Sequence, residues 1–554
     1  MKAFGRVQDV LLDAFSFCRR IGGAPAAPGI VLVLLTGCFR TPPPADLRII
    51  NGPEPESLDP HQITGQADGR IALALFEGLT RYDPRTGQPV PGLAARWEVS
   101  TDGTVYTFHL RPEAAWSDGR PITTADVVWS WQRALAPATA NEYAGALFPL
   151  RNARAFALGE LDDFTRVGVR AVDARELQVE LESPTPFFLD LLAYSPCTVV
   201  PRHVIEPIGD RWLHARPFAA SGPYTLEFWR LNDRVRLRRN AFYWDAANVR
   251  CEVVDLLSCV SPNTALNLYE SGAVDVVWDK ELIPTHLLDE LRRRADFHTY
   301  NFLGTYFIRC NVTKAPFNDP RVRRALALAV DKERLVRRIT RGGERIAACL
   351  SPPGIMNGSV PYRPPAGLDH DPEAARRLLA EAGFPGGQGF PVVEYTYNTA
   401  PSHRNIALEL RDMWQRELGL RLELRQLEWK TWLAAQSALD YDLIRSSWIG
   451  DYDDPNTFLD LFLSDNPNNR TGWRNGRYDA LLREANAEPD AARRQERLAA
   501  AEHLLVAEAL PVIPLYFYVG MACFDDARVH GIHLNLRGEN PLWAIGKEAA
   551  PAPP

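Results

Sequence analysis

The segment Trp448-Ile-Gly-Asp-Tyr-Asp-Asp-Pro-Asn-Thr-Phe-Leu459 is the stretch from which the fold of this chain is interpreted. It follows Asp440-Tyr-Asp-Leu-Ile-Arg445, whose apolar and β-favouring residues predict a strand. Asp451 therefore stands where a strand leaves its sheet, directly after the small Gly450. A carboxylate at such a position can bind a ligand ammonium through a charge-assisted hydrogen bond.

Acidic residues in such a segment also have a purely structural interpretation. Aspartate side chains cap turns and helix N-termini by accepting hydrogen bonds from backbone N–H groups. We adopt this interpretation for Asp453 and Asp454, the second of which stands directly before Pro455. For Asp451, ligand binding and capping remain alternatives at this point, and the rest of the chain decides between them.

The remainder of the chain alternates strand and helix patterns. Residues 104–110 and 177–181 alternate apolar and polar side chains between turn residues, which predicts strands. Helices are predicted after Asp319-Pro320, after Asp371-Pro372 and over residues 406–418, because apolar residues recur there at helical spacing. A glycine ends each of the last two helices. Helices followed by strands are typical of α/β folds.

A series of short motifs accompanies this pattern. In chain order they are Ser57-Leu-Asp-Pro-His61, Leu75-Phe-Glu-Gly-Leu79, Trp116-Ser-Asp-Gly-Arg-Pro121, Ala125-Asp-Val-Val-Trp-Ser-Trp-Gln-Arg133, Ser221-Gly-Pro-Tyr224, Ala315-Pro-Phe-Asn-Asp-Pro-Arg-Val-Arg323, Leu378-Leu-Ala-Glu-Ala-Gly383, Tyr397-Asn-Thr399 and Glu428-Trp-Lys-Thr431. Together with the segment around Asp451, they resemble the oligopeptide-binding proteins of bacterial ABC importers, in the peptide/nickel solute-binding protein family 5. The resemblance covers residues 48 to 545 of the chain.

The resemblance implies an α/β fold of the periplasmic-binding-protein-like type II, with two lobes, a hinge and an extra domain. The chain of 554 residues is long enough for several cores, since single cores stop growing at roughly 250–300 residues. The expected limits are 1–37 for a lipoprotein signal peptide, 38–47 for a Pro-rich tether, 48–74, 201–300 and 518–545 for lobe I, 75–200 for the extra domain, 301–517 for lobe II and 546–554 for a tail.

The resemblance also implies which residues bind the two ends of a peptide. Asp451 falls at the position that receives the α-amino group. Arg445 and His403 match cationic positions near the carboxylate end. An arginine fork suits a carboxylate, whereas a histidine binds one only while protonated, so binding through His403 is expected to weaken at higher pH.

Four further residues are expected to line the cleft: Trp448, Gly450, Trp429 and Tyr194. Tyr194 stands where a cleft histidine can occur in the family. The charged residues have structural alternatives, because Arg445 can pair with a nearby strand aspartate and His403 can be an idle residue beside a helix start. The two tryptophans can instead pack into a core.

The N-terminus has the features of a bacterial export signal. Arg19 and Arg20 supply positive charge, residues 29–35 form a short apolar core, and Leu35-Thr-Gly-Cys38 matches the lipoprotein cleavage box. The apolar core is too short to span a bilayer, which needs about 20 residues. A buried membrane helix and a chance Gly-Cys pair are the alternatives. We expect lipidation at Cys38, with Thr41-Pro-Pro-Pro44 as an extended tether.

Composition excludes several other classes. The net charge of −7 and the lack of a basic stripe argue against nucleic acid as a partner. The sequence has no Gly-x-Ser-x-Gly, His-Glu-x-x-His or phosphate-loop motif, so we expect no enzyme activity. Apart from Cys18 and Cys38, the cysteines lack metal-ligand spacing and allow 15 pairings, which leaves buried thiols as the expectation. No metal or other cofactor is expected.

These observations predict an exported substrate-binding lipoprotein that captures short oligopeptides by hinge closure and delivers them to an ABC importer. Its partners would be the peptides and the permease and ATPase subunits of the transporter. We expect a monomer in the periplasm or cell envelope, held to the membrane by a lipid on Cys38. A receptor for murein peptides or dipeptides, and a surface interaction or signalling protein on the same fold, are the alternatives.

Overall fold

The computed structural model describes residues 43–548. The expected signal peptide, the lipidation site at Cys38 and most of the expected tail therefore lie outside the described residues. A compact unit that begins at Ala45 contains the helices and strands. Within the described part of the chain, none of the helices combines the length and apolar character needed to cross a bilayer.

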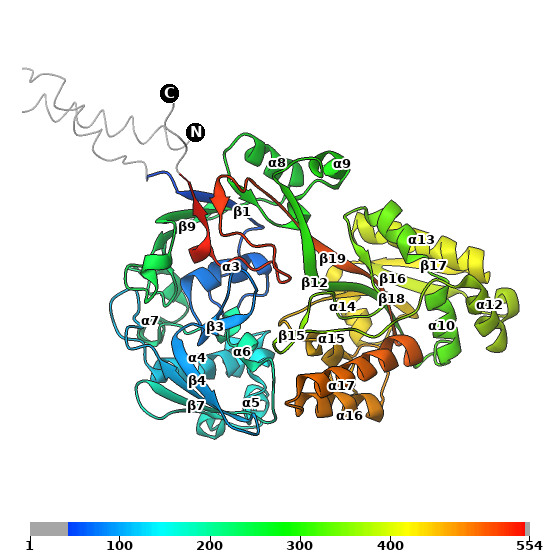
Figure 1. Ribbon diagram of the computed structural model, residues 1–554, viewed down its shortest axis with the longest axis horizontal. Helices are drawn as coiled ribbons and strands as arrows, with labels where there is room; N and C mark the ends of the chain where they lie inside the picture. The colour runs from blue at the N-terminus through cyan, green and yellow to red at the C-terminus, as the bar shows by residue number, and fades with distance from the viewer. Residues whose placement is uncertain (1–42, 549–554) are drawn as a thin grey trace, which may run out of the picture. The chain divides into compact units, whose positions relative to one another are not determined.

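Two long antiparallel strands, β12 (Phe297–Cys310) and β19 (Val512–Phe524), form the centre of an 11-stranded sheet (Figure 1). The strand order is β17 (Leu422–Leu427), β16 (Val393–Asn398), β18 (Leu443–Ile449), β12, β19, β11 (Val276–Val277), β1 (Leu47–Gly52), β10 (Val253–Ser258), β9 (Arg234–Arg239) and β8 (Tyr224–Arg230), with β13 (Arg345–Ile346) also on β19. We call the part built on β1 and β8–β11 the first lobe, and the part built on β13 and β16–β18 the second lobe. The predicted two-lobed α/β fold is confirmed.

The pairing of β12 with β19 slips where the strands pass from one lobe to the other. Asn301 pairs with Val519 and Thr305 pairs with Phe517, so β12 holds two more residues than β19 between these pairs. Such a bulge bends the strand and increases its twist. It contains Gly304, where a Cβ would lie 2.7 Å from Ile449 Cδ1 and 2.8 Å from Tyr518 Cδ2, so a larger residue would displace these side chains.

Buried side chains form a separate cluster in each part of the fold. One cluster takes its residues from 79–199 and packs on a four-stranded sheet of β4 (Ala94–Val99), β5 (Val105–Leu110), β7 (Glu176–Glu180) and β6 (Val169–Ala171). Another spans Tyr306 to Tyr516 in the second lobe, and a third spans Leu47 to Ile545 in the first. The exact domain limits stay a prediction.

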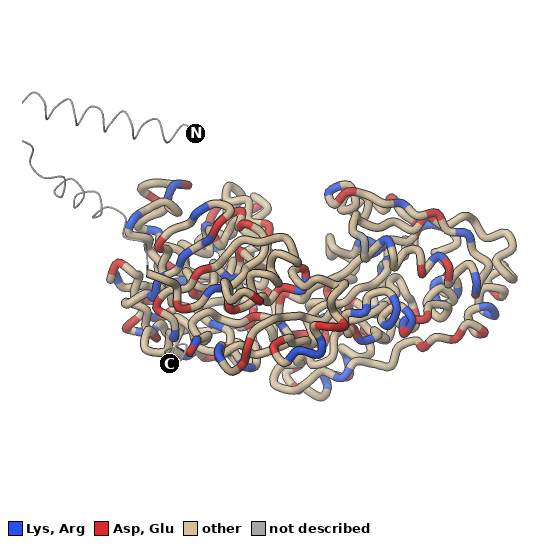
Figure 2. The backbone as a smooth tube through the Cα atoms, turned by 90° about the horizontal axis from the view of Figure 1, so that it is seen from above, with Lys and Arg blue, Asp and Glu red and all other residues tan. Residues whose placement is uncertain are grey.

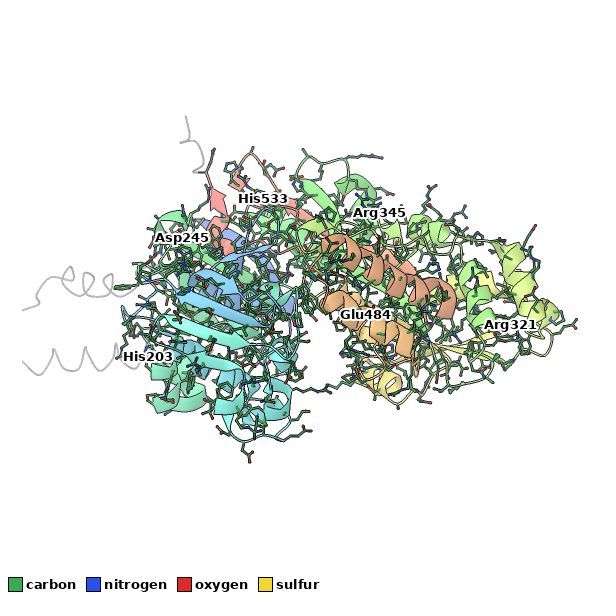
Figure 3. The ribbon with its side chains drawn as sticks, turned by 60° about the horizontal axis from the view of Figure 1, so that its bottom comes forward. His203, Asp245, Arg321, Arg345, Glu484 and His533 are labelled. Atoms are coloured by element: carbon green, nitrogen blue, oxygen red, sulfur yellow. The ribbon has the colours of Figure 1, made fainter. Side chains whose placement is uncertain are left out.

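The predicted helices form, and the N-caps of the first two are the expected ones, whereas the third begins at Pro401, before the predicted residue 406. The three helices are α10 (Pro320–Leu328), α12 (Pro372–Glu381) and α13 (Pro401–Leu418). Asp319 accepts a hydrogen bond from the backbone N–H of Arg321, which Figure 3 labels at the start of α10 (2.8 Å), and Asp371 accepts one from Ala374 (2.9 Å). Gly419 ends α13 with a positive φ of 70°. Other helices are α3 (Gln66–Leu75), α4 (Thr124–Leu135), α8 (Pro262–Glu270), α14 (Trp429–Ser437), α15 (Asn456–Leu459), α16 (Gly476–Asn486) and α17 (Ala491–His503).

Candidate ligand-binding site

A cavity of about 650 Å³ lies where the bulge of β12 meets the end of β18 and the start of α3. This volume is within the range of about 300–1,000 Å³ that is typical of ligand sites. Both lobes and the segment 75–200 contribute to its wall. The residues used below are Asp68, Tyr143, Tyr194, Asp279, Lys280, Gly450, Asp451, Tyr518, Arg537 and Glu539.

Asp451 presents an unpaired carboxylate to this cavity. Its backbone N–H donates to Thr457 Oγ1 (3.0 Å), and its carbonyl oxygen accepts from Arg537 Nη2 (3.0 Å). No hydrogen bond or ion pair from residues 43–548 reaches its carboxylate oxygens. Burial raises the pKa of Asp451 to about 6, although the positive charge of Arg537 opposes this shift. A ligand ammonium would compensate this partly desolvated charge.

The two aspartates that follow have different structural roles. Asp454 caps as expected, because its Oδ1 accepts from the backbone N–H of Asn456 at the start of α15 (3.1 Å). It also forms a buried ion pair with Arg494 (2.8 Å). The prediction that Asp453 is a cap is wrong, because its carboxylate accepts from Gln88 Nε2 and from the backbone N–H of Met356 and so joins distant segments.

Arg445 lies on β18 and is only 5% exposed. Its Nη2 donates to Ser447 Oγ (3.0 Å) and to Tyr518 Oη (3.1 Å), and both of these residues line the cavity. The expected structural alternative is not found, because the strand aspartate Asp442 pairs with Lys314 instead (3.2 Å). Among the described residues, no carboxylate forms an ion pair with Arg445. The guanidinium is therefore a buried cation with neutral partners.

His403 lies beside this guanidinium at the start of α13. Its Nδ1 is 3.5 Å from Tyr306 Oη. Burial, together with the positive charges of Arg445 and Lys280, lowers the pKa of His403 to about 3. The imidazole is thus neutral at physiological pH in the unliganded site. His403 is not among the residues that line the cavity, and its binding of a ligand carboxylate stays a prediction.

The two tryptophans do not line the cavity. Successive residues of a strand point to opposite faces, so Trp448 lies on the other face of β18 from Ser447. Its Nε1 donates to Thr457 Oγ1 (3.4 Å), and its ring packs against a hydrophobic core of the second lobe. Trp429 is 50% exposed and stacks on Trp432, with ring centroids 4.8 Å apart. The expected contact of Trp448 and Trp429 with a ligand therefore has no support from the lining of this cavity.

Gly450 and Tyr194 line the cavity, and their contact with a ligand stays a prediction. The N–H of Gly450 donates to the carbonyl oxygen of Leu303 in the β12 bulge (2.8 Å). A Cβ at this position would lie 2.7 Å from Leu303 Cγ, so a larger residue would push the strand end away. Tyr194 packs edge-on against Tyr143, with ring centroids 5.7 Å apart.

Tyr143, Lys280 and Arg537 are among the residues of the wall that sequence reasoning missed. A signal for Lys280 was present, because the short strand β11 runs directly into Trp278-Asp279-Lys280, as β18 runs into Gly450-Asp451. Polar residues at a strand end thus marked both sides of the cavity. Tyr143 and Arg537 follow no comparable pattern, and only the three-dimensional arrangement brings them together.

Acidic residues outnumber basic ones in the cavity wall, whereas the two signs are interspersed along the backbone as a whole (Figure 2). The acidic residues are Glu54, Glu56, Asp68, Asp279, Glu281, Asp451 and Glu539, and the basic ones are Arg70, Lys280 and Arg537. Burial raises the pKa of Asp68 to about 6 and also raises that of Glu539. Within residues 43–548, no group of three or more His, Cys, Asp or Glu side chains could hold a metal ion.

Comparison with known proteins gives consistent results. Residues 88–470 match the family described as bacterial extracellular solute-binding proteins, family 5. The chain is 35% identical over 481 residues to the periplasmic oligopeptide-binding protein OppA of Salmonella typhimurium, covering 85% of this chain and 86% of the relative. It is 36% identical over 483 residues to the probable deoxycholate-binding periplasmic protein YgiS of Escherichia coli, covering 85% and 87%.

A solved structure has the same fold. The murein tripeptide-binding protein MppA of Escherichia coli superposes with a TM-score of 0.76 at 30% sequence identity. The match covers 91% of this chain and 98% of the solved chain. The likeness therefore extends over both lobes and the segment 75–200.

Proposed function

We propose a function for this chain from one premise: it belongs to the bacterial extracellular solute-binding proteins of family 5. It is a binding protein, not an enzyme, and it captures short oligopeptides outside the cytoplasm for an ABC importer. The observation that carries this proposal is the unpaired carboxylate of Asp451 in a cavity whose other side holds Lys280 and, behind Tyr518, Arg445. A peptide has an ammonium that can pair with Asp451 and a carboxylate that can pair with the cations on the other side.

The charges of the site favour a zwitterion over a simple anion. Deoxycholate, after which the relative YgiS is named, has a carboxylate and an apolar steroid but no ammonium. Such a ligand would leave the desolvated Asp451 unpaired, which is unfavourable. Murein peptides carry both kinds of group and therefore remain the second candidate ligand, consistent with the similarity to MppA.

The proposed mechanism is closure of the two lobes around an extended peptide. The bulge in β12 supplies the bending point, since the strands that join the lobes change register there. Contacts between the second lobe and the segment 75–200 support a closed form: the ring of Tyr452 stacks on Phe187 at 4.0 Å, and the N–H of Asp453 donates to Asp190 Oδ2 (2.7 Å). A ligand that contacts both lobes shifts the population towards this form.

Native mass spectrometry of the chain from residue 39, purified without denaturation, tests the proposed ligand class. Co-purified masses that fit mixed peptides of a few residues would support oligopeptide binding and would give the preferred length. Masses that fit a murein tripeptide would favour the second candidate. An empty protein that also fails to respond to tripeptides in calorimetry would contradict the proposal.

Peptide affinity is expected to fall when the pH drops below about 6. The pKa of Asp451 is about 6 in the unliganded site, and an ammonium would lower it in the complex, so the complex binds fewer protons. Affinity for trialanine should therefore be constant near pH 7 and fall by up to about tenfold per pH unit below 6. The termini of the peptide do not titrate between pH 5 and 7. Calorimetry across this range measures the slope.

Two variants show which residue causes this dependence of affinity on pH. Asp451→Asn should flatten it, although Asp68, whose pKa is also raised to about 6, can leave a residual dependence. His403→Gln should keep the wild-type slope, because the pKa of His403 in the unliganded protein is about 3, well below this pH range. A slope that disappears in His403→Gln and persists in Asp451→Asn would contradict this assignment.

We also propose a lipid on Cys38, a monomeric state and delivery to the permease and ATPase subunits of an importer. The cleavage box at residues 35–38 supports the lipid anchor. Replacing Cys38 by serine should move the protein from the membrane fraction to the soluble fraction. Equal membrane association of the two forms would argue against the anchor.

A further inference from the structure

Two cations from opposite lobes flank one tyrosine of the cavity wall. Lys280 opens the short turn η7 (Lys280–Leu282) that follows β11 in the first lobe, and its Nζ lies 3.7 Å from the ring centroid of Tyr518. Arg445 belongs to β18 in the second lobe, and its Nη2 donates to the hydroxyl of the same tyrosine (3.1 Å). The two cations therefore lie on the same tyrosine side chain, Lys280 at its ring and Arg445 at its hydroxyl.

Although the cavity wall is acidic, its described carboxylates form few ion pairs with these two cations. The only ion pair of Lys280 among the described residues is with Glu281, at 3.9 Å, and the side chain of Glu281 is 81% exposed. Such surface pairs contribute little. Asp279 is close in sequence, but its Oδ1 accepts from the backbone N–H of Glu281 (3.0 Å) and so caps the turn. Among residues 43–548, the hydrogen-bond partners of Arg445 are hydroxyl and amide groups.

We propose that Lys280 and Arg445 bind one ligand carboxylate from the two lobes, and that this anion is what holds the lobes together at this side of the cavity. This inference rests on the proposed function and adds a requirement to it. Without an anion, the two like charges beside Tyr518 repel each other and favour separation of the lobes. A carboxylate between them replaces that repulsion with two attractions.

The inference predicts which peptides the protein accepts. A peptide with a free carboxyl terminus places its anion between the two cations. The same peptide with a C-terminal amide has no charge at that end and leaves the cations uncompensated. Discrimination of this kind arises as much from the penalty against the wrong ligand as from attraction to the right one.

The decisive measurement is the affinity of trialanine and of trialanine amide for the wild-type protein and for Lys280→Met. The wild type should prefer the acid by on the order of 100-fold. In Lys280→Met the affinity for trialanine should fall about tenfold, whereas the affinity for trialanine amide should fall little or rise. The ratio of the two affinities should therefore shrink about tenfold. Lys280→Arg keeps the charge and should retain most of the wild-type ratio.

A structural role for Lys280 makes a different prediction. If its ammonium only packs on the ring of Tyr518, Lys280→Met should weaken both peptides equally and leave the ratio unchanged, which would overturn the inference. Lys314→Met is the matched control, because Lys314 pairs with Asp442 outside the cavity and should change neither affinity. Binding of neither peptide by the wild type would instead overturn the proposed function, and the role of Lys280 with it.

Closure provides a second readout. Small-angle scattering of the wild type should show a smaller radius of gyration with saturating trialanine than with saturating trialanine amide. Lys280→Met should reduce this difference. The same contraction with both peptides in the wild type would show that the carboxylate does not hold the lobes together.

Discussion

Replacing Asp451 by asparagine is expected to weaken trialanine binding about 100-fold, or roughly 3 kcal/mol. The carboxylate is the one charged group of the β18 end that faces the cavity, and no described residue pairs with it. The amide keeps the shape of the side chain but cannot offset the charge of a buried ammonium. The loss therefore includes the cost of desolvating that ammonium, in addition to the ion pair itself. Isothermal titration calorimetry at pH 7 measures the effect.

The same substitution is expected to stabilise the unliganded protein. The pKa of Asp451 is about 6 in the folded protein against 3.8 for the unperturbed group, so its ionised form is disfavoured by folding. The penalty is absent below the unperturbed pKa, develops as the pH rises towards 6 and is complete above it. Asp451→Asn should therefore raise the free energy of unfolding at pH 7 by about 2 kcal/mol, which urea denaturation measures.

The opposite signs of these two effects separate a binding role from a capping role. A cap that is lost would lower stability by about 1 kcal/mol and leave peptide affinity unchanged. Asp454→Asn provides the contrast, because Asp454 caps α15 and pairs with Arg494 away from the cavity, and it should destabilise the protein. Wild-type affinity in Asp451→Asn would refute the assignment of the ammonium site.

Arg537→Met is expected to lower the free energy of unfolding by about 4 kcal/mol. This guanidinium is buried and donates to Asp190 Oδ1 (2.9 Å), to Tyr82 Oη (2.8 Å) and to the carbonyl oxygen of Asp451 (3.0 Å). Its removal leaves the carboxylate of Asp190 buried and uncompensated. Breaking a buried pair in this way costs more than the pair contributes when it is intact.

The effect of Arg537 on the site should be separable from its effect on stability. The charge of Arg537 lowers the pKa of Asp451, so its loss should raise that pKa and move the acid limb of the binding profile to higher pH. Adding Asp190→Asn to Arg537→Met should recover more than half of the lost stability without restoring the binding profile.

An exposed ion pair supplies the matched control for Arg537. Arg337 pairs with Glu333 at 2.8 Å, and both side chains are more than half exposed. Arg337→Met should cost less than about 1 kcal/mol. If Arg537→Met costs no more than this control, the ion pair with Asp190 does not stabilise the fold as described.

The sequence determined those features that depend on neighbouring residues. The proline and aspartate at the starts of α10 and α12 and the glycine after α13 act within one helical turn, so their positions predicted the helix ends. Asp451 and Gly450 were identified because a strand end brings its next residues to the edge of a sheet. The order of the short motifs along the chain indicated the family, and the family implied the two-lobed fold.

Only the tertiary structure decided which side chains face the cavity and in which charge state. Trp448 is next to Ser447 of the cavity wall, yet it points to the opposite face of the strand and packs against a hydrophobic core. The pKa of His403 is set by burial and by Arg445 and Lys280, which lie 42 and 123 residues away in the sequence. Burial and Coulomb interaction act through space and not along the chain, so no local pattern could have revealed the neutral imidazole or the cations that meet at Tyr518.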